Sequence, residues 1–120
     1  MEPTSVEKIY FSACYIAGRK YWQADEAWRL LHIGSVLEMR PEPDNSHDPW
    51  AVALYFNSGD NVYKLGYIPK GKNRTIHALL LMGWHEVFEC RVSRLDPMAD
   101  YDSQIGITVS ILNTRNSSAE

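Results

Sequence analysis

The chain contains six short runs of apolar, β-branched and aromatic residues, separated by turns rich in Gly, Pro, Asn and Asp. The runs cover residues 8–17, 35–40, 51–56, 63–68, 85–94 and 104–112. Each has the length and composition of a β-strand. This succession predicts a mainly β fold with one or two helices, a small OB-like antiparallel β-barrel of about six strands.

One segment interrupts the strands with helical spacing. An apolar stripe lies between residues 73 and 82 and consists of Ile76, Leu79 and Leu80. Asn73 is a favourable N-cap, and Gly83 stands where a glycine commonly ends a helix. We therefore predict a helix over 73–82 that packs on the sheet, and a shorter helical turn over 25–31.

The chain has 120 residues, which suits one domain. We expect that domain over 8–113, between flexible tails at 1–7 and 114–120. No apolar run approaches the roughly 20 residues of a membrane helix, and the first residues lack the pattern of a signal peptide. We therefore expect a cytoplasmic protein without membrane contact. Cys14 and Cys90 lie in apolar runs, so both are predicted to be buried free thiols.

The formal net charge is −3 and the sequence pI is near 5.8. This argues against the broad positive surface by which proteins grip long duplex DNA. A local basic patch remains compatible with the count, because several cations fall in three short clusters: Arg19, Lys20, Lys64, Lys70, Lys72 and Arg74.

Residues 42–49 form a polar, Pro-containing turn that leads directly into the predicted strand 51–56. Asp44, Asn45, His47 and Asp48 place two carboxylates, an amide and an imidazole within five positions. Two interpretations follow: a turn that its own Asn and Asp side chains stabilise, or a rigid loop that binds a ligand.

A second segment combines charge with aromatic rings. Arg19 and Lys20 are followed by Tyr21 and Trp22, on what should be a loop after the first strand. Cations that hold phosphate beside rings that stack on bases are typical of sites for single-stranded nucleic acid. The alternative is a loop whose aromatic rings fold back into the core.

Signals for catalysis are weak. The segment 66–73 has glycines and a lysine at Walker A spacing, but Asn73 replaces the magnesium-binding Ser or Thr and Pro69 removes a backbone donor. The four histidines form no metal-binding motif, and no serine or cysteine has the context of a nucleophile. We therefore predict no enzyme, no cofactor and no metal; a small phosphoesterase using Asp44, Asp48 and a metal is a minor alternative.

The order of several motifs resembles the HIRAN domain family. The motifs are AGRKYW at 17–22, GSVLEMRPEPDNSHDPWAVAL at 34–54, LGYIPKGKN at 65–73, and a helix that ends in Leu-Met-Gly at 81–83. The resemblance spans nearly the whole chain. It implies a modified OB-like barrel that captures the free 3′ end of single-stranded DNA. Family members stand alone in bacteria or precede Swi/Snf-type translocases that remodel stalled replication forks, which implies a link to DNA repair.

The resemblance also implies roles for particular residues. Lys20 would hold phosphate and Tyr21 would stack on a base, with Trp22 as a second stacking surface. Asn45 and Asp48 would meet the terminal 3′-hydroxyl group. The remaining positions are His47 in place of a stacking tyrosine, Tyr67 in place of a polar side chain, and Lys70 at the DNA backbone.

The sequence thus predicts a non-catalytic nucleic-acid-binding module that recognises single-stranded DNA at its free 3′ end. Its expected partners are single-stranded DNA or DNA 3′ ends, together with other DNA-processing proteins. The alternative is a protein-interaction module of the same fold that has lost end binding.

Overall fold

The computed structural model describes residues 7–113, so the predicted flexible tails fall outside the described residues except for Glu7. In this range no helix is long and apolar enough to cross a membrane. The strands are β1 (Lys8–Tyr15), β2 (Val36–Pro41), β3 (Val52–Asn57), β4 (Val62–Tyr67), β5 (Phe88–Leu95) and β6 (Ile105–Leu112). The helices are α1 (Ala24–Ala27) and α2 (Arg74–Leu81), with short 3₁₀ turns η1 (Arg19–Tyr21), η2 (Trp28–Leu30), η3 (His85–Val87) and η4 (Tyr101–Ser103).

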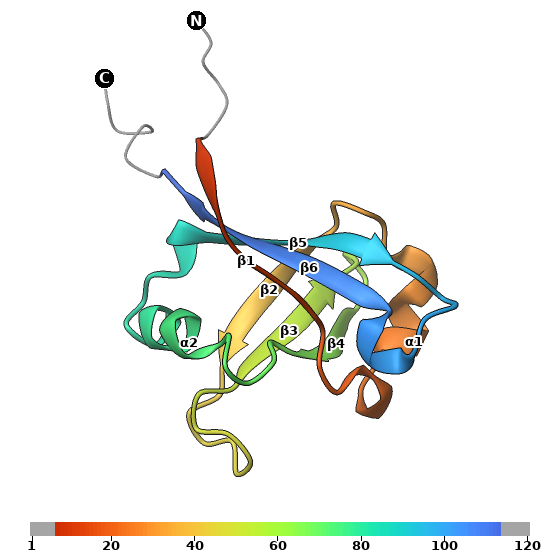
Figure 1. The fold of residues 1–120 in the computed structure, drawn as a ribbon, viewed down its shortest axis with the longest axis horizontal. Helices are drawn as coiled ribbons and strands as arrows, with labels where there is room; N and C mark the ends of the chain where they lie inside the picture. Colours follow the sequence, from red (N-terminus) through yellow and green to blue (C-terminus); the bar gives the residue numbers. More distant parts are fainter. Residues whose placement is uncertain (1–6, 114–120) are drawn as a thin grey trace, which may run out of the picture.

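The strands form one six-stranded antiparallel sheet in the order β1-β6-β5-β2-β3-β4, which confirms the mainly β prediction. Figure 1 shows that the sheet is strongly curled, so that β5 and β6 run across β2 and β3. β1 lies at an edge of the sheet, and most of its side chains are exposed.

The predicted barrel is not confirmed, because the two edge strands are not joined by a ladder of hydrogen bonds. Only an isolated bridge connects them, in which Ala17 and Tyr67 exchange two backbone hydrogen bonds of 2.9 and 3.0 Å. Continuing this antiparallel register by two residues places Pro69 opposite Tyr15. Proline has no N–H to donate, and Gly71, at φ 89°, turns the chain. The edges therefore part after one bridge.

α2 begins one residue later than predicted and packs against β2 through buried Ile76 and Leu80. Gly83 has φ 93° and ends the helix as expected. Asn73 precedes the helix but makes no capping hydrogen bond with its side chain; it is buried and bonds to Asp48 instead.

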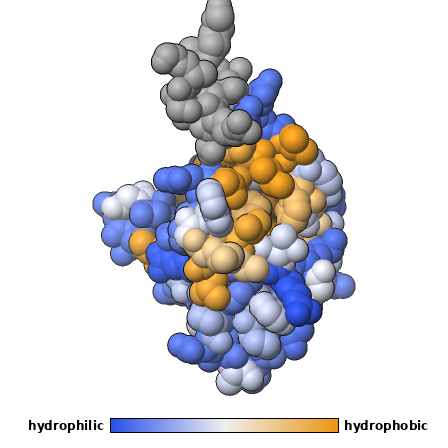
Figure 2. Space-filling model, turned by 90° about the vertical axis from the view of Figure 1, so that its left-hand side faces the viewer, coloured by the Kyte–Doolittle hydropathy of each residue, from blue (hydrophilic) through white to orange (hydrophobic). Residues whose placement is uncertain are grey.

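The remaining core lies inside the curl of the sheet and includes Leu54, Leu65, Ile107 and Val109. β2 and β5 pair at only two positions and then separate. Beyond these positions the core is less completely covered, and a groove lies beside Leu80 and Phe88. Figure 2 shows apolar side chains gathered on the side of the molecule where α2 lies.

Candidate functional site

A pocket of about 410 Å³ lies where the chain after β1 meets the end of β4. Three segments form it: η1 and its neighbours, the loop over 42–51, and the segment from Tyr67 to Lys70. Seven of the eight predicted binding residues line it, namely Tyr21, Trp22, Asn45, His47, Asp48, Tyr67 and Lys70. The eighth, Lys20, lies outside the lining, and its ammonium stands 5.1 Å from the centroid of the Tyr21 ring.

One wall of the pocket is aromatic. Tyr21 is 73% exposed and Trp22 42% exposed, so neither ring folds back into the core. Trp22 meets the ring of Tyr67 edge-on, with centroids 5.9 Å apart. The wall thus presents ring surface to solvent, as a stacking site requires.

Arg19 does not belong to the pocket, although the sequence had paired it with Lys20 as a phosphate contact. Its side chain is buried, with the residue 2% exposed, and its Nη2 donates a 2.6 Å hydrogen bond to Asp25. The guanidinium lies between the rings of Trp28 and Tyr101, at 5.5 and 4.7 Å from their centroids. The buried side chain of Arg19 therefore fixes η1 to the rest of the domain, while Tyr21 on the same turn is exposed.

The side chains of Asn45 and Asp48 hold the loop in shape. Oδ1 of Asn45 accepts the backbone N–H groups of His47 and Asp48, at 2.8 and 3.0 Å. The two carboxylate oxygens of Asp48 accept the N–H of Trp50 at 2.9 Å and the amide of Asn73 at 2.8 Å. The self-stabilised turn is therefore present, and the same turn forms a side of the pocket, so the two interpretations of this loop are compatible.

The charge of Asp48 is also fixed by these contacts. The N–H of Trp50 lowers the pKa of the carboxyl group; burial opposes this, and the amide of Asn73 and the charge of Lys70 add to the lowering. Asp48 is consequently an anion at neutral pH, beside the cation of Lys70 at the same pocket.

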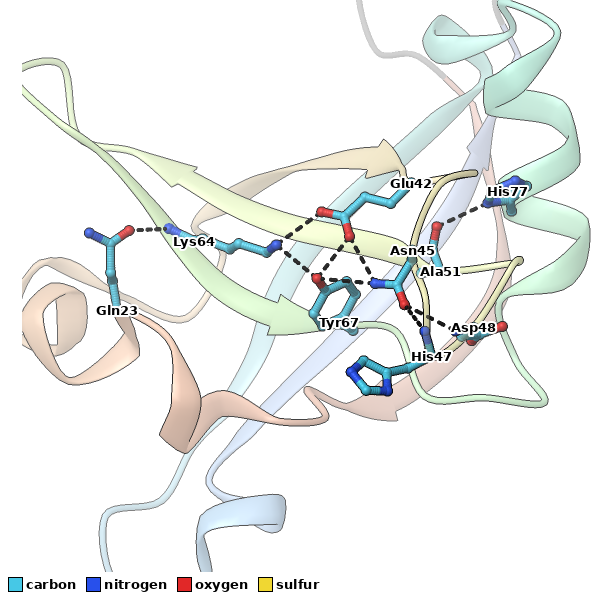
Figure 3. Close-up of polar contacts among 9 residues, drawn as sticks. All are labelled: Gln23, Glu42, Asn45, His47, Asp48, Ala51, Lys64, Tyr67 and His77. Atoms are coloured by element: carbon cyan, nitrogen blue, oxygen red, sulfur yellow. Dashed lines mark hydrogen bonds and ion pairs between the residues drawn. The ribbon is translucent and has the colours of Figure 1, made fainter.

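Glu42 and Lys64 organise the pocket but were not predicted as site residues. Nζ of Lys64 donates to Oε2 of Glu42 at 2.9 Å and to the hydroxyl of Tyr67 at 2.8 Å. The Tyr67 hydroxyl and the Asn45 amide both donate to Oε1 of Glu42, at 2.8 and 3.0 Å. Figure 3 shows these side chains converging from β4, the end of β2 and the loop.

The same network reaches the aromatic wall. The ammonium of Lys64 lies 3.8 Å from the centroid of the Trp22 ring, a cation–π contact. Gln23 accepts the N–H of Lys64 at 2.9 Å and donates its own N–H to the Lys64 carbonyl at 2.7 Å. In the sequence, the one indication for Glu42 is that it lies in the same turn as Asn45 and Asp48. Lys64 has no indication beyond its charge.

Burial acts to raise the pKa of Glu42, but hydrogen bonds from Asn45, Lys64 and Tyr67 outweigh it and hold the pKa below its ordinary value. Burial likewise acts to lower the pKa of Lys64, and its bonds to Tyr67 and Glu42 raise it overall. Glu42 is thus ionised and Lys64 protonated at neutral pH, and the ion pair is intact.

Replacing Glu42 with glutamine is expected to lower the free energy of unfolding by roughly 1–2 kcal/mol at pH 7, because charge-assisted hydrogen bonds are lost. A carboxyl group with a lowered folded-state pKa contributes stability above its unfolded pKa of about 4.3 and loses it as pH falls through the folded value. The difference in unfolding free energy between Glu42→Gln and wild type should therefore shrink as the pH falls.

Urea titrations of both proteins between about pH 3 and pH 7 measure this convergence. Glu26→Gln is the matched control, because Glu26 is exposed and makes no side-chain hydrogen bond within residues 7–113. A constant gap at every pH would contradict a role for the Glu42 charge.

Within the described residues, no group of three His, Cys, Asp or Glu side chains lies close enough to hold a metal ion. Cys14 and Cys90 are free thiols as predicted, although only Cys90 is fully buried.

The chain is similar to known proteins in sequence family and in fold. The family model of the HIRAN domain matches residues 9–111. No curated protein matches the chain. A crystal structure of a protein from Lactobacillus plantarum is similar, with a TM-score of 0.73 and 18% identity over 90% of this chain and 98% of that one. At that identity the similarity establishes the mainly β fold alone.

Proposed function

This chain belongs to the HIRAN domain family of DNA-binding modules, and we propose that its pocket holds the free 3′ end of a single DNA strand without performing chemistry on it. The observation that carries the proposal is the convergence of Tyr21, Trp22, Asp48 and Lys70, from three separate segments, on one pocket.

The aromatic wall supplies affinity without sequence preference. Every base has a π-face, so rings such as Tyr21 contribute about 1–3 kcal/mol per stacked base whatever the base. The exposure of Tyr21 and the support of Trp22 by Lys64 fit such a surface, because the first ring is accessible to a base and the second is held in place before a ligand arrives.

Asp48 supplies preference for an end. Both of its oxygens already accept one hydrogen bond, but each carboxylate oxygen has a second lone pair for a hydroxyl donor. The same negative charge repels a phosphate group at that position. Lys70, which lines the same pocket, would meet the phosphate of the preceding nucleotide.

A strand ending in a 3′-hydroxyl is expected to bind about tenfold to a hundredfold more tightly than the same strand ending in a 3′-phosphate, or than a circular strand. This corresponds to roughly 1.5–3 kcal/mol for one charge-assisted hydrogen bond gained or opposed. Fluorescence anisotropy at low and moderate salt measures the ratio.

The ligand end is varied here because Asp48→Asn would not isolate the charge: its new amide group would face the amide of Asn73 and disturb the loop. Tyr21→Ala serves as the control, and it should weaken every strand alike while leaving the preference between ends unchanged. Equal affinity for linear and circular strands would overturn end binding and favour a protein-interaction module of the same fold.

A further inference from the structure

Two further clefts extend the pocket along the open edge of β1. The first, of about 600 Å³, shares Ala17 and Gly18 with the pocket and runs between Tyr15 and Pro69. The second, of about 250 Å³, shares Lys72 with the first and reaches Phe11. Because neighbouring hollows share lining residues, the three follow one another along β1 and the segment 69–75, where the sheet fails to close.

Cations follow this row at alternate positions. Lys70 lines the pocket, Lys72 lines both clefts, and Arg74 lines the second cleft. All three are exposed, and within residues 7–113 none forms an ion pair. Among the described residues, Asp102 is the one acidic residue that lines the first cleft. The charge of this segment is therefore available to an anionic ligand.

Arg74 is also held in position. Its guanidinium carbon lies 4.4 Å from the centroid of the Trp50 ring, and Trp50 in turn meets the ring of buried His77 edge-on at 5.6 Å. A cation stacked on a ring loses less side-chain freedom when it meets a phosphate than an unsupported one does.

We infer that this row is the path of the sugar–phosphate backbone on the 5′ side of the bound end, with Lys72 and Arg74 as its phosphate contacts. The inference rests on the proposed function, since the pocket would receive the terminal nucleotides and the clefts those before them. It assigns a second binding region that holds several nucleotides, and it explains how a chain of net charge −3 attracts a polyanion through one local strip.

An extended peptide pairing with the open edge of β1 is the competing occupant, because Phe11 and Tyr15 offer apolar contacts there. Continuity with the pocket favours the nucleic acid, and so do three exposed cations that form no ion pair within residues 7–113.

The test compares oligothymidylates of about two and about ten nucleotides, both with a 3′-hydroxyl, on wild type and on Lys72→Gln/Arg74→Gln. Wild type should bind the longer strand more tightly, and the double variant should lose most of that advantage while binding the short strand as before. Its salt slope on the long strand should fall by about 1.4, since each phosphate contact on a single strand contributes about 0.7. Arg29→Gln is the control, because Arg29 is exposed and lines none of the three hollows.

Several results would overturn the inference. The proposed backbone path would be wrong if wild type bound the short and the long strand with equal affinity. It would also be wrong if the double variant lost the same affinity for both strands. In either case the pocket would remain a site for the strand end alone. Displacement of the long strand by an uncharged, apolar extended peptide would assign the clefts to a peptide that pairs with β1. Failure of wild type to bind either strand would overturn the proposed function itself.

Discussion

Replacing Gly66 with alanine is expected to cost roughly 2–6 kcal/mol of unfolding free energy. Gly66 has φ 148°, a conformation that costs other residues about 1–3 kcal/mol. A Cβ atom there would also lie 2.5 Å from the carbonyl oxygen of Ala17 and 2.6 Å from Cγ2 of Ile16. Relieving that overlap costs about 1–3 kcal/mol more, because the obstacle is backbone and a buried side chain.

Gly59→Ala separates the two costs. Gly59 also has a positive φ, 100°, but a Cβ atom there would meet nothing within 4 Å. It should therefore show the conformational cost alone, and chemical denaturation of both variants measures the difference. If Gly59→Ala is as destabilising as Gly66→Ala, the overlap with Ala17 contributes nothing to the cost of a side chain at position 66.

Gly66→Ala should also weaken binding of single strands. The clash pushes apart Ala17 and Tyr67, whose bridge sets the distance between the aromatic wall and the end of β4. Binding should therefore fall in Gly66→Ala, and not in Gly59→Ala, under conditions where both remain folded.

Arg19→Ala is expected to lower the free energy of unfolding by about 2–5 kcal/mol, the range for emptying a buried site. Most of this loss should come from packing, because Arg19 is 2% exposed between two rings, whereas Asp25, its ion-pair partner, has a side chain 71% exposed. An ion pair with one exposed partner contributes at most about 1 kcal/mol.

Arg19→Met tests that division, since methionine fills much of the same volume. It also removes the buried Nε and Nη1 groups, which have no hydrogen-bond partner within residues 7–113. Thermal and urea unfolding should show a clearly smaller loss for Arg19→Met than for Arg19→Ala. Equal losses would instead mean that the charge, through Asp25 and the two rings, supplies the stability.

Local patterns in the sequence determined the strands and the main helix. Alternating and β-branched runs gave six strands, and five of the six begin within one residue of their predicted start. The sixth, β5, begins at Phe88 and not at His85, because η3 occupies the three residues between. The apolar stripe of α2 and the end of the helix at Gly83 could be predicted, because helical spacing and a positive φ after the helix are local requirements.

The residue types of the candidate site could also be predicted from the sequence, because Tyr21, Asn45, Asp48 and Lys70 lie in short motifs whose order can be recognised. What the sequence could not show is that these motifs share one pocket. Their meeting depends on the approach of the two sheet edges at Ala17 and Tyr67, positions 50 residues apart in the chain.

Tertiary structure alone decided which charges are structural. Arg19 and Lys20 are neighbours of the same charge, yet one is buried between rings and the other lies exposed beside Tyr21. Glu42 and Lys64 became partners only when β2 and β4 were brought together around β3. Burial, ion pairing and closure of a sheet all depend on contacts between distant segments, which local sequence patterns do not encode.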